Sequence, residues 1–191
     1  MSKLIFNTLI FTIIMQAVFT VDFISSKNVS RKRAKELLSQ MTLDEKISML
    51  HGHPNDVNGK GYVGYVSGIE RVNIPALKLS DAGNGFRDND HPGTTTCWPS
   101  ALAMGSTFDV ELSNKFGIAL GEEFFDKGSN VLLGPGLNLA RVPLNGRNFE
   151  YLSGGDPYLG KSLVGPLIKG IQSKNVIATA KHWVLNNQVF R

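Results

Sequence analysis

The sequence contains a single cysteine, Cys97, so it cannot form a disulfide bond within the chain. No Gly-x-Gly-x-x-Gly motif follows a strand and opens a helix, and no Gly-x-x-x-x-Gly-Lys-Ser/Thr motif occurs. The Gly-x-Ser-x-Gly elbow of serine-dependent α/β hydrolases is also absent. These absences argue against a disulfide-stabilised domain, a nucleotide cofactor and a catalytic serine.

Charge of one sign is not concentrated either. The 20 basic and 16 acidic residues give a net charge of +4, and the basic residues are scattered except at residues 31–33. Because a basic patch is the electrostatic mark of nucleic-acid binding, we expect no nucleic-acid partner. His51 and His53 have no further histidine or carboxylate at metal-ligand spacing, so we expect no metal site, and no other cofactor is indicated.

Long apolar stretches are confined to the N-terminus. Lys3 is followed by Leu4-Ile5-Phe6 and by an apolar run over residues 9–21 that only Thr and Gln interrupt. This pattern predicts a signal peptide over residues 1–21; an uncleaved anchor is the alternative, and only then do we expect a membrane partner. The sequon Asn28-Val29-Ser30 predicts glycosylation of Asn28 and, with the signal, a secreted protein, lysosomal or cell-surface delivery remaining open.

The N-terminal part after this segment carries helical signals. Residues 30–41 have helical spacing at Ala34, Leu37 and Leu38. Thr42-Leu43-Asp44-Glu45 is a capping box that predicts a second helix through Ile47 and Leu50. Residues 51–68 are rich in Gly, Asn and aromatic residues without a period, and we predict a loop there.

Strand and helix patterns alternate from residue 76 onward. Apolar runs predict strands over residues 76–80, 130–133 and 176–180. Because a helical pattern separates each pair of strands, the order is βαβαβ, and the strands should be parallel with right-handed crossovers.

The two intervening helices have defined boundaries in the sequence. The first covers residues 109–127 and ends at Gly128, and the second begins at Asp156-Pro157. Asp156 is more plausible as a helix cap than as a ligand, and Pro166 should kink the second helix. The stripes expected to face the core are Leu112, Phe116, Leu120 and Phe124 in the first helix and Leu159, Leu163, Leu167 and Ile171 in the second.

Polar residues follow each predicted strand. Asp81 and Arg87 follow the first, a loop with Arg147 follows the second, and Lys181-His182 follows the third. The carboxyl ends of parallel strands are where α/β barrels and open α/β sheets place their sites. The alternatives are a turn-capping Asp81 with a surface Arg87, and an exposed basic pair at the third strand.

The loop over residues 134–156 carries the strongest signal. A loop this long with no period of its own is uncommon unless it builds a site, and Arg147-Asn148-Phe149-Glu150-Tyr151 is suited to a polar, flat-faced ligand. It resembles the Gly-Pro…Pro-x-x-Gly-Arg-Asn-Phe-Glu signature of glycoside hydrolase family 3, the β-glucosidase family.

Three other segments resemble that family in the right order. Residues 41–47 are similar to the opening of its barrel domain. Residues 80–87 resemble its Asp-Gly-Pro-x-Gly-x-Arg turn, with Ala82-Gly83 in place of Gly-Pro. Residues 178–183 resemble Ala-Thr-x-Lys-His-Phe/Tyr, and residues 186–188 match Asn-x-Gln until Val189 replaces an acid. The resemblance covers Met41 to Gln188.

The resemblance implies a fold and a function. It implies an α/β fold: residues 22–191 would be the N-terminal part of a (β/α)8 TIM-barrel-like domain, truncated after about half the barrel. It implies a retaining β-glucosidase acting on a β-glucoside or cello-oligosaccharide. The residues that it assigns to substrate binding are Asp81, Arg87, Arg147, Lys181 and His182, with Glu150 as a buried partner of Arg147 or Lys181.

The resemblance also implies what this stretch does not contain. The family's nucleophile and acid/base follow the Lys-His pair, so we expect no catalytic residue in these 191 residues and no hydrolysis by the isolated chain. The alternative is a non-catalytic sugar-binding or interaction protein that has kept part of the family's barrel.

Overall fold

The computed structural model describes residues 27–52 and 61–188. The predicted signal peptide over residues 1–21 and His53 lie outside these ranges. The chain divides into two units, residues 1–50 with 69–74 and residues 51–68 with 75–191. Within the described ranges, no helix has the length and apolar content needed to cross a membrane.

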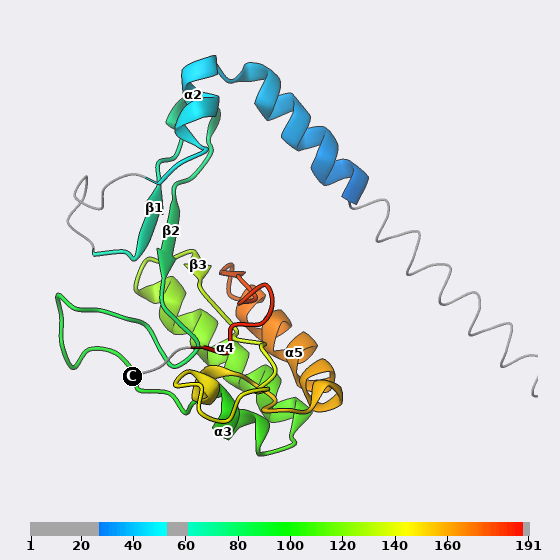
Figure 1. Cartoon of the computed structure of the whole chain (residues 1–191). Coiled ribbons are helices and arrows are strands. Elements are labelled where there is room, and N and C mark those ends of the chain that lie inside the picture. The colour runs from blue at the N-terminus through cyan, green and yellow to red at the C-terminus, as the bar shows by residue number, and fades with distance from the viewer. Residues whose placement is uncertain (1–26, 53–60, 189–191) are drawn as a thin grey trace, which may run out of the picture. The chain divides into compact units, whose positions relative to one another are not determined.

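A four-stranded sheet in the order β1-β2-β3-β4 organises the larger unit (Figure 1). The strands β2 (Leu77–Ser80), β3 (Val131–Leu132) and β4 (Ile177–Ala178) are parallel, as the sequence predicts. β1 (Gly64–Val66) pairs antiparallel with β2, so the predicted loop over residues 51–68 is wrong at this point. A strand of three residues is too short to show alternation in the sequence, and its pairing with β2 is what defines it.

The helices α4 (Val110–Asp126) and α5 (Pro157–Gln172) run side by side against the sheet (Figure 1). Asp109 caps α4 through the amide of Leu112 at 2.9 Å, and Gly128 follows its end with a φ of 82°. Asp156 caps α5 through the amide of Tyr158 at 2.8 Å, and α5 continues through Pro166. The helix boundaries therefore agree with the prediction to within one residue.

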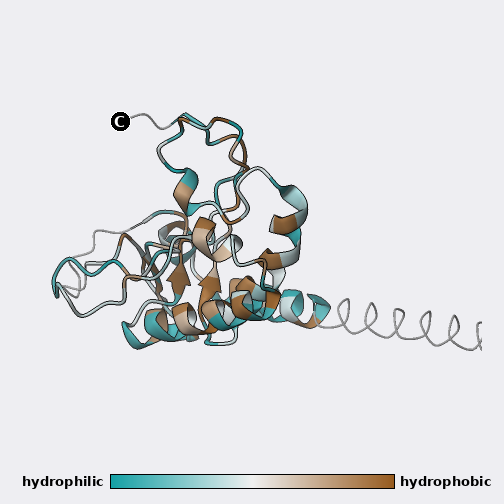
Figure 2. Cartoon of the chain, turned by 90° about the horizontal axis from the view of Figure 1, so that it is seen from below, coloured by the Kyte–Doolittle hydropathy of each residue, from teal (hydrophilic) through white to brown (hydrophobic). Residues whose placement is uncertain are grey.

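The core of this unit lies between the two helices and the sheet, whose strands are apolar in Figure 2. The predicted stripes are buried except at their first positions: Leu112 is 41% exposed and Leu159 is half-buried. Ser113, Gly117 and Gly121 are buried instead, on the α4 face that meets α5. The core residues on these elements are Phe116, Leu120, Phe124, Leu132, Leu163, Leu167, Ile171 and Val176.

Short elements complete the larger unit. α3 (Ala101–Gly105) is capped by Ser100 and buries Ala101 and Met104. The short helix η3 (Asn148–Glu150) lies in the loop between β3 and α5, where the sequence predicts the site.

The smaller unit contains the helix over residues 27–40, α2 (Leu43–Ser48) and the short helix η2 (Glu70–Val72). The predicted capping box at α2 is present, since the Thr42 hydroxyl accepts from the amide of Glu45 and the Glu45 carboxylate from that of Thr42. Glu45 also accepts two hydrogen bonds from Arg71. These bonds, the Arg71 contact first, lower the pKa of Glu45 to about 2.

The core of the smaller unit is a cluster of Met41, Ile69 and Val72, with Leu37, Met49 and Ile74 packed against it. The predicted packing residues Ala34 and Leu38 are exposed, and α2 ends at Ser48, so the predicted extension to Leu50 is wrong. Only Leu37 of the first predicted stripe meets a core, because the other side chains of that helix project into solvent.

Candidate sugar-binding site at the strand ends

The sequence-predicted polar residues lie at the carboxyl ends of β2, β3 and β4. Asp81 follows β2 directly, and Lys181 comes soon after β4. Backbone bonds join the loop after β3 to the end of β4: the amide of Leu137 donates to the carbonyl of Lys181 at 2.6 Å, and the amide of Lys181 donates to that of Pro135 at 3.0 Å. The loop that carries Arg147 is therefore fixed beside Lys181.

Gly136 permits this close approach. It forms bridges with both Tyr151 and Lys181, and a Cβ atom at this position would lie 2.5 Å from the carbonyl oxygen of Glu150. Any side chain here would therefore push the segment that carries Glu150 away from the strand end.

Glu150 holds two cations at the centre of the site. Its Oε1 accepts from Nε of Arg147, and its Oε2 lies 3.5 Å from Nζ of Lys181. The Glu150 side chain is 12% exposed. Burial acts to raise the pKa of Glu150, but the Arg147 hydrogen bond and the charges of Lys181 and Arg147 outweigh it, so the pKa lies below its usual range. Glu150 is therefore ionised and paired at neutral pH.

The charge of Asp81 also affects the pKa of Arg147. The hydrogen bond to Glu150 raises the pKa of Arg147, burial opposes this, and the negative charges of Glu150 and Asp81 add to the rise. The Asp81 carboxylate after β2 therefore contributes, as the smallest of these effects, to the electrostatics of Arg147 in the loop after β3.

Asp81 and Arg87 form a loose pair across one turn. Nη1 of Arg87 lies 3.8 Å from Oδ2 of Asp81, and the amide of Arg87 donates to the carbonyl of Asp81 at 3.0 Å. The Arg87 side chain is 59% exposed and the Asp81 side chain is 33% exposed. Solvent therefore screens this ion pair, and the pair contributes little to stability. The Asp81 carboxylate remains accessible as an acceptor.

A set of amide and hydroxyl groups holds His182. Its backbone amide donates to Oδ1 of Asn138 at 2.8 Å, and its ring nitrogen Nδ1 lies 3.0 Å from Nδ2 of Asn186 and 3.4 Å from the hydroxyl of Tyr151. Burial, followed by the charges of Arg147 and Lys181, lowers the pKa of His182. The imidazole is therefore neutral at pH 7 and keeps one N–H to donate.

The loop that carries Asp81 is fastened to α4. The carboxylate of Glu123 accepts from the amide of Thr96 and from Nε1 of Trp98, both at 2.6 Å. The amide of Trp98 in turn donates to the carbonyl of Asn84 within the Asp81 turn, at 3.0 Å. Glu123 and Trp98 thus set the position of Asp81 from outside the site.

A cleft of about 520 Å³ borders the site. Trp183 lines this cleft and is 97% exposed. Two buried polar atoms nearby, Oγ of Ser80 and Oδ1 of Asn187, have no hydrogen-bond partner among the described residues. The cleft is lined by Leu137, Asn138, Leu139, Arg141, Ala180, Lys181, His182, Trp183, Val184, Leu185 and Asn187.

The donor set favours a neutral polyhydroxyl ligand. Within residues 27–52 and 61–188, no three His, Cys, Asp or Glu side chains gather as metal ligands would. Cationic donors, a neutral imidazole and an accessible carboxylate suit hydroxyl groups, which both donate and accept.

Sequence reasoning finds the charged members of the site but misses several uncharged ones. The partners of His182 are Asn138 and Tyr151, which lie 44 and 31 residues before it in the chain, and Asn186, which lies four residues after it. Glu123 and Trp98 act through hydrogen bonds over a separation of 25 residues. No spacing rule connects such pairs, and only the density of Asn in the 134–156 loop hints at them.

Comparison with known proteins finds relatives over most of this chain. The model of the glycosyl hydrolase family 3 N terminal domain matches residues 28–187. Thermostable beta-glucosidase B of Acetivibrio thermocellus is 39% identical over 166 residues, which are 82% of this chain and 21% of that protein. Beta-glucosidase 1 of Aspergillus aculeatus is 41% identical over 158 residues, 82% of this chain and 18% of that protein.

Solved structures of beta-glucosidases also match most of this chain. Beta-glucosidase 3B from Thermotoga neapolitana in complex with alpha-D-glucose matches 82% of this chain and 24% of its own, with a TM-score of 0.75 and 37% identity. DesR, a beta-glucosidase from Streptomyces venezuelae in complex with D-glucose, matches 82% of this chain and 19% of its own chain, with a TM-score of 0.76 and 40% identity. The chain spans about a fifth of the length of its curated relatives. The predicted partial barrel is confirmed.

Proposed function

This chain belongs to glycosyl hydrolase family 3, and from that premise we propose that the whole protein is a retaining β-glucosidase that removes terminal β-D-glucosyl residues. Relatives at 39% and 41% identity are named as β-glucosidases, and two structural neighbours were solved with glucose bound. The substrate class that we propose is a β-glucoside or a cello-oligosaccharide.

One observation carries the proposal: three strand ends direct complementary groups to one region. Asp81 offers an accessible acceptor, while Lys181 and the neutral His182 offer donors beside the ion pair of Arg147 and Glu150. Vicinal hydroxyls of a glucose ring both donate and accept, so a buried ring needs such a mixed set. The role of these residues is to bind and orient the sugar.

The chemistry itself requires two carboxylates. A retaining glycosidase uses one as nucleophile and one as acid and base, at a separation of about 5–5.5 Å. Glu150 is held ionised by two cations, so it has no proton to give as the acid, and its two oxygens face Arg147 and Lys181 and are not free to attack a sugar. We therefore propose that this stretch supplies the sugar contacts, that the reacting carboxylates lie elsewhere in the protein, and that these 191 residues alone do not hydrolyse a glucoside.

A chimera tests this function. Residues 27–188 replace the matching segment of the Thermotoga neapolitana enzyme, and release of p-nitrophenol from its β-D-glucoside is measured. We expect the chimera to be active, the isolated chain to be inactive, and Asp81→Ala to lower kcat/KM of the chimera at least about tenfold, or about 1.4 kcal/mol. Asp90→Ala is the matched control, because Asp90 lies in the same loop and is exposed.

Two results count against the function. Hydrolysis by the isolated chain would place the chemistry within these residues. Equal kinetics of Asp81→Ala, Asp90→Ala and the parent chimera would make Asp81 a turn residue without a role in sugar binding.

We also propose that the protein enters the secretory route. The support is the apolar stretch within residues 1–21 and the sequon at Asn28, whose side chain is exposed. Expression in a eukaryotic secretory host should give a product that glycosidase treatment shifts in mass and that Asn28→Gln does not form. An unglycosylated product that stays in the cytosol contradicts this route.

A further inference from the structure

One carboxylate on α4 holds the segment over residues 94–98. Oε1 of Glu123 accepts a hydrogen bond from the amide of Thr96, and Oε2 accepts one from Nε1 of Trp98, each at 2.6 Å. A carboxylate accepts such bonds more strongly than a neutral oxygen does. Because each oxygen has its own donor, Glu123 fixes both the backbone and the indole ring of this segment.

The residues that Glu123 holds also contact the turn over residues 81–87. The amide of Trp98 donates to the carbonyl of Asn84 at 3.0 Å. Gly85 has a φ of 131°, and a Cβ atom there would lie 2.4 Å from the carbonyl oxygen of Thr96. The two backbones therefore touch with no side chain between them, so a shift of Thr96 and Trp98 shifts the turn.

The turn itself is a rigid support for Asp81. Ala82 and Gly85 exchange backbone hydrogen bonds at 2.9 and 3.1 Å, and the amide of Arg87 donates to the carbonyl of Asp81 at 3.0 Å. Among the residues that the structure describes, the Asp81 carboxylate has no ion pair or hydrogen bond closer than its 3.8 Å pair with Arg87. Its backbone therefore sets where the carboxylate lies.

We propose that Glu123 is a positioning residue of the sugar site, which keeps the Asp81 carboxylate where a sugar hydroxyl meets it and does not itself touch the ligand. The inference rests on the proposed function, because it requires Asp81 to accept from that hydroxyl. Binding groups must be held to within about 0.5 Å, and sugar contacts strengthen toward the transition state. A loosened turn should therefore lower turnover as well as affinity.

The chimera that carries residues 27–188 tests this role. Glu123→Gln places an amide nitrogen against the donor of either Thr96 or Trp98, so one of the two hydrogen bonds is lost. We expect kcat/KM for p-nitrophenyl β-D-glucoside to fall about fivefold, which is less than the loss expected for Asp81→Ala. The fall should vanish in a chimera that already carries Asp81→Ala. Such a double-mutant cycle separates an effect through Asp81 from a general loss of structure.

Trp98→Phe breaks the same link by a smaller change. The indole ring packs edge-on against Phe116 with ring centroids 5.8 Å apart, and a phenyl ring keeps an aromatic contact there while it removes the Nε1 donor. The backbone bond to Asn84 remains, so the expected loss of kcat/KM is smaller, about threefold. This loss should also vanish in the Asp81→Ala background.

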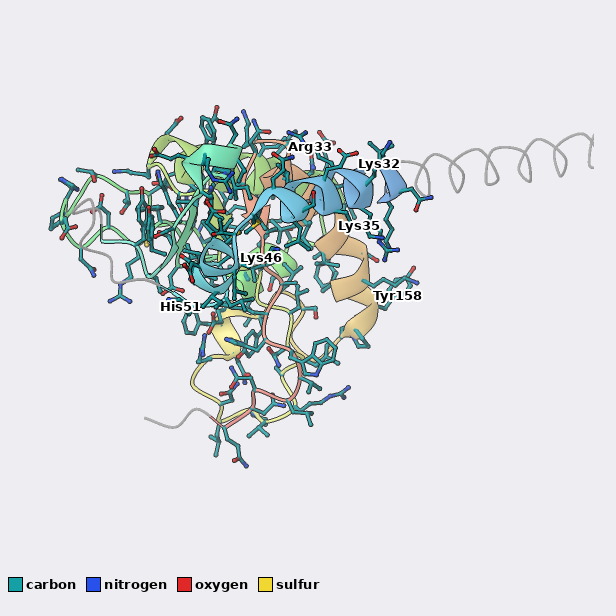
Figure 3. The ribbon with its side chains drawn as sticks, turned by 90° about the horizontal axis from the view of Figure 1, so that it is seen from above. Lys32, Arg33, Lys35, Lys46, His51 and Tyr158 are labelled. Atoms are coloured by element: carbon teal, nitrogen blue, oxygen red, sulfur yellow. The ribbon has the colours of Figure 1, made fainter. Side chains whose placement is uncertain are left out.

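Each variant has a matched control. Glu122→Gln removes the same charge from the neighbouring position of α4, where the side chain is 58% exposed and pairs with Lys174. Tyr158→Phe, like Trp98→Phe, removes the polar group of an aromatic side chain; Tyr158 projects from α5 and is 79% exposed (Figure 3). Both controls should keep the kinetics of the parent chimera, and circular dichroism should show that all variants are folded.

Two results overturn the inference and leave the proposed function standing, provided that Asp81→Ala itself is impaired. One is equal kinetics of Glu123→Gln and Glu122→Gln. The other is an equal fall in the parent and Asp81→Ala backgrounds, which would make Glu123 a general structural residue. An inactive chimera, or parent kinetics in Asp81→Ala, would remove the proposed function and this inference with it.

Discussion

Glu150 shares one carboxylate between two cations, and both would be left without a counter-ion if it were removed. Breaking a buried ion pair by losing one partner costs about 3–5 kcal/mol, and the low end applies here because Arg147 is 34% exposed. Glu150→Gln should therefore lower the free energy of unfolding by about 3 kcal/mol, measured by denaturant titration at pH 7. The same substitution should also loosen the contacts that the proposed sugar ligand meets.

Glu122→Gln is the control for this change. Glu122 pairs with Lys174 at 3.1 Å but is 58% exposed, and exposed pairs contribute about 0–1 kcal/mol. If the two variants lose equal stability, the Glu150 pair is no stronger than a surface pair.

The pH dependence follows from the same carboxylate. The folded pKa of Glu150 lies below the ordinary value of 4.5, so its contribution to stability is fully present above pH 4.5 and is lost as the pH falls through the folded pKa. Glu150→Gln should accordingly flatten the acid side of the stability profile. His182 acts in the same direction below pH 6.5, since its lowered pKa makes the folded state bind fewer protons than the unfolded chain there.

Among the elements, α4 and α5 depend on glycine for their close approach. A Cβ at Gly117 would lie 2.2 Å from the carbonyl oxygen of Leu167, and backbone there cannot move aside cheaply. Gly117→Ala should therefore destabilise the chain by about 1–3 kcal/mol in spite of the better helix propensity of alanine, which is about 1 kcal/mol. Thermal unfolding followed by circular dichroism measures the change.

Gly165→Ala is the contrasting case on α5. A Cβ at Gly165 has no atom within 4 Å apart from its chain neighbours and the backbone of its own helix, but Pro166 follows and disfavours a helical residue with a Cβ before it, which offsets the gain of about 1 kcal/mol in helix propensity. The stability should therefore change little, and a loss equal to that of Gly117→Ala would contradict the close-packing explanation.

These glycines explain what the sequence could and could not predict about the elements. The spacing of Phe116, Leu120 and Phe124 predicts the buried side of α4 correctly. It fails at Leu112 because the adjoining buried position is Ser113, whose hydroxyl donates to the carbonyl of Leu163 at 3.0 Å. Apolar periodicity cannot detect a face built from small residues.

Sequence patterns predict only part of the candidate site as well. Asp81, Arg147 and Lys181 were predictable because each follows a strand whose pattern is visible in the sequence. The partners of His182 depend on contacts between distant segments, and amide side chains such as Asn138 occur throughout the chain without a distinguishing pattern.

At the scale of the whole molecule, one apolar area of the larger unit is open to solvent. Trp183, Val184 and Leu185 are 97%, 61% and 74% exposed and line the cleft beside the candidate site. Ile177 on the edge strand β4 is 50% exposed as well. In the part of the chain that the structure describes, β4 pairs with β3 alone, and exposed apolar surface and a free strand edge each favour contact with another molecule.

We therefore predict that the chain associates with itself through this area. Sedimentation velocity over a concentration series should show that Trp183→Ser with Leu185→Ser shifts association to at least about tenfold higher concentration, since removing two large apolar side chains from a contact costs more than 1.4 kcal/mol. The control is Phe125→Ser with Tyr158→Ser, which removes two exposed aromatic residues near opposite ends of α4 and α5. Residues 1–26 are the same in every variant, so their contribution cancels in the comparison. An equal shift in the control, or no shift in Trp183→Ser with Leu185→Ser, would mean that this area is not the contact surface.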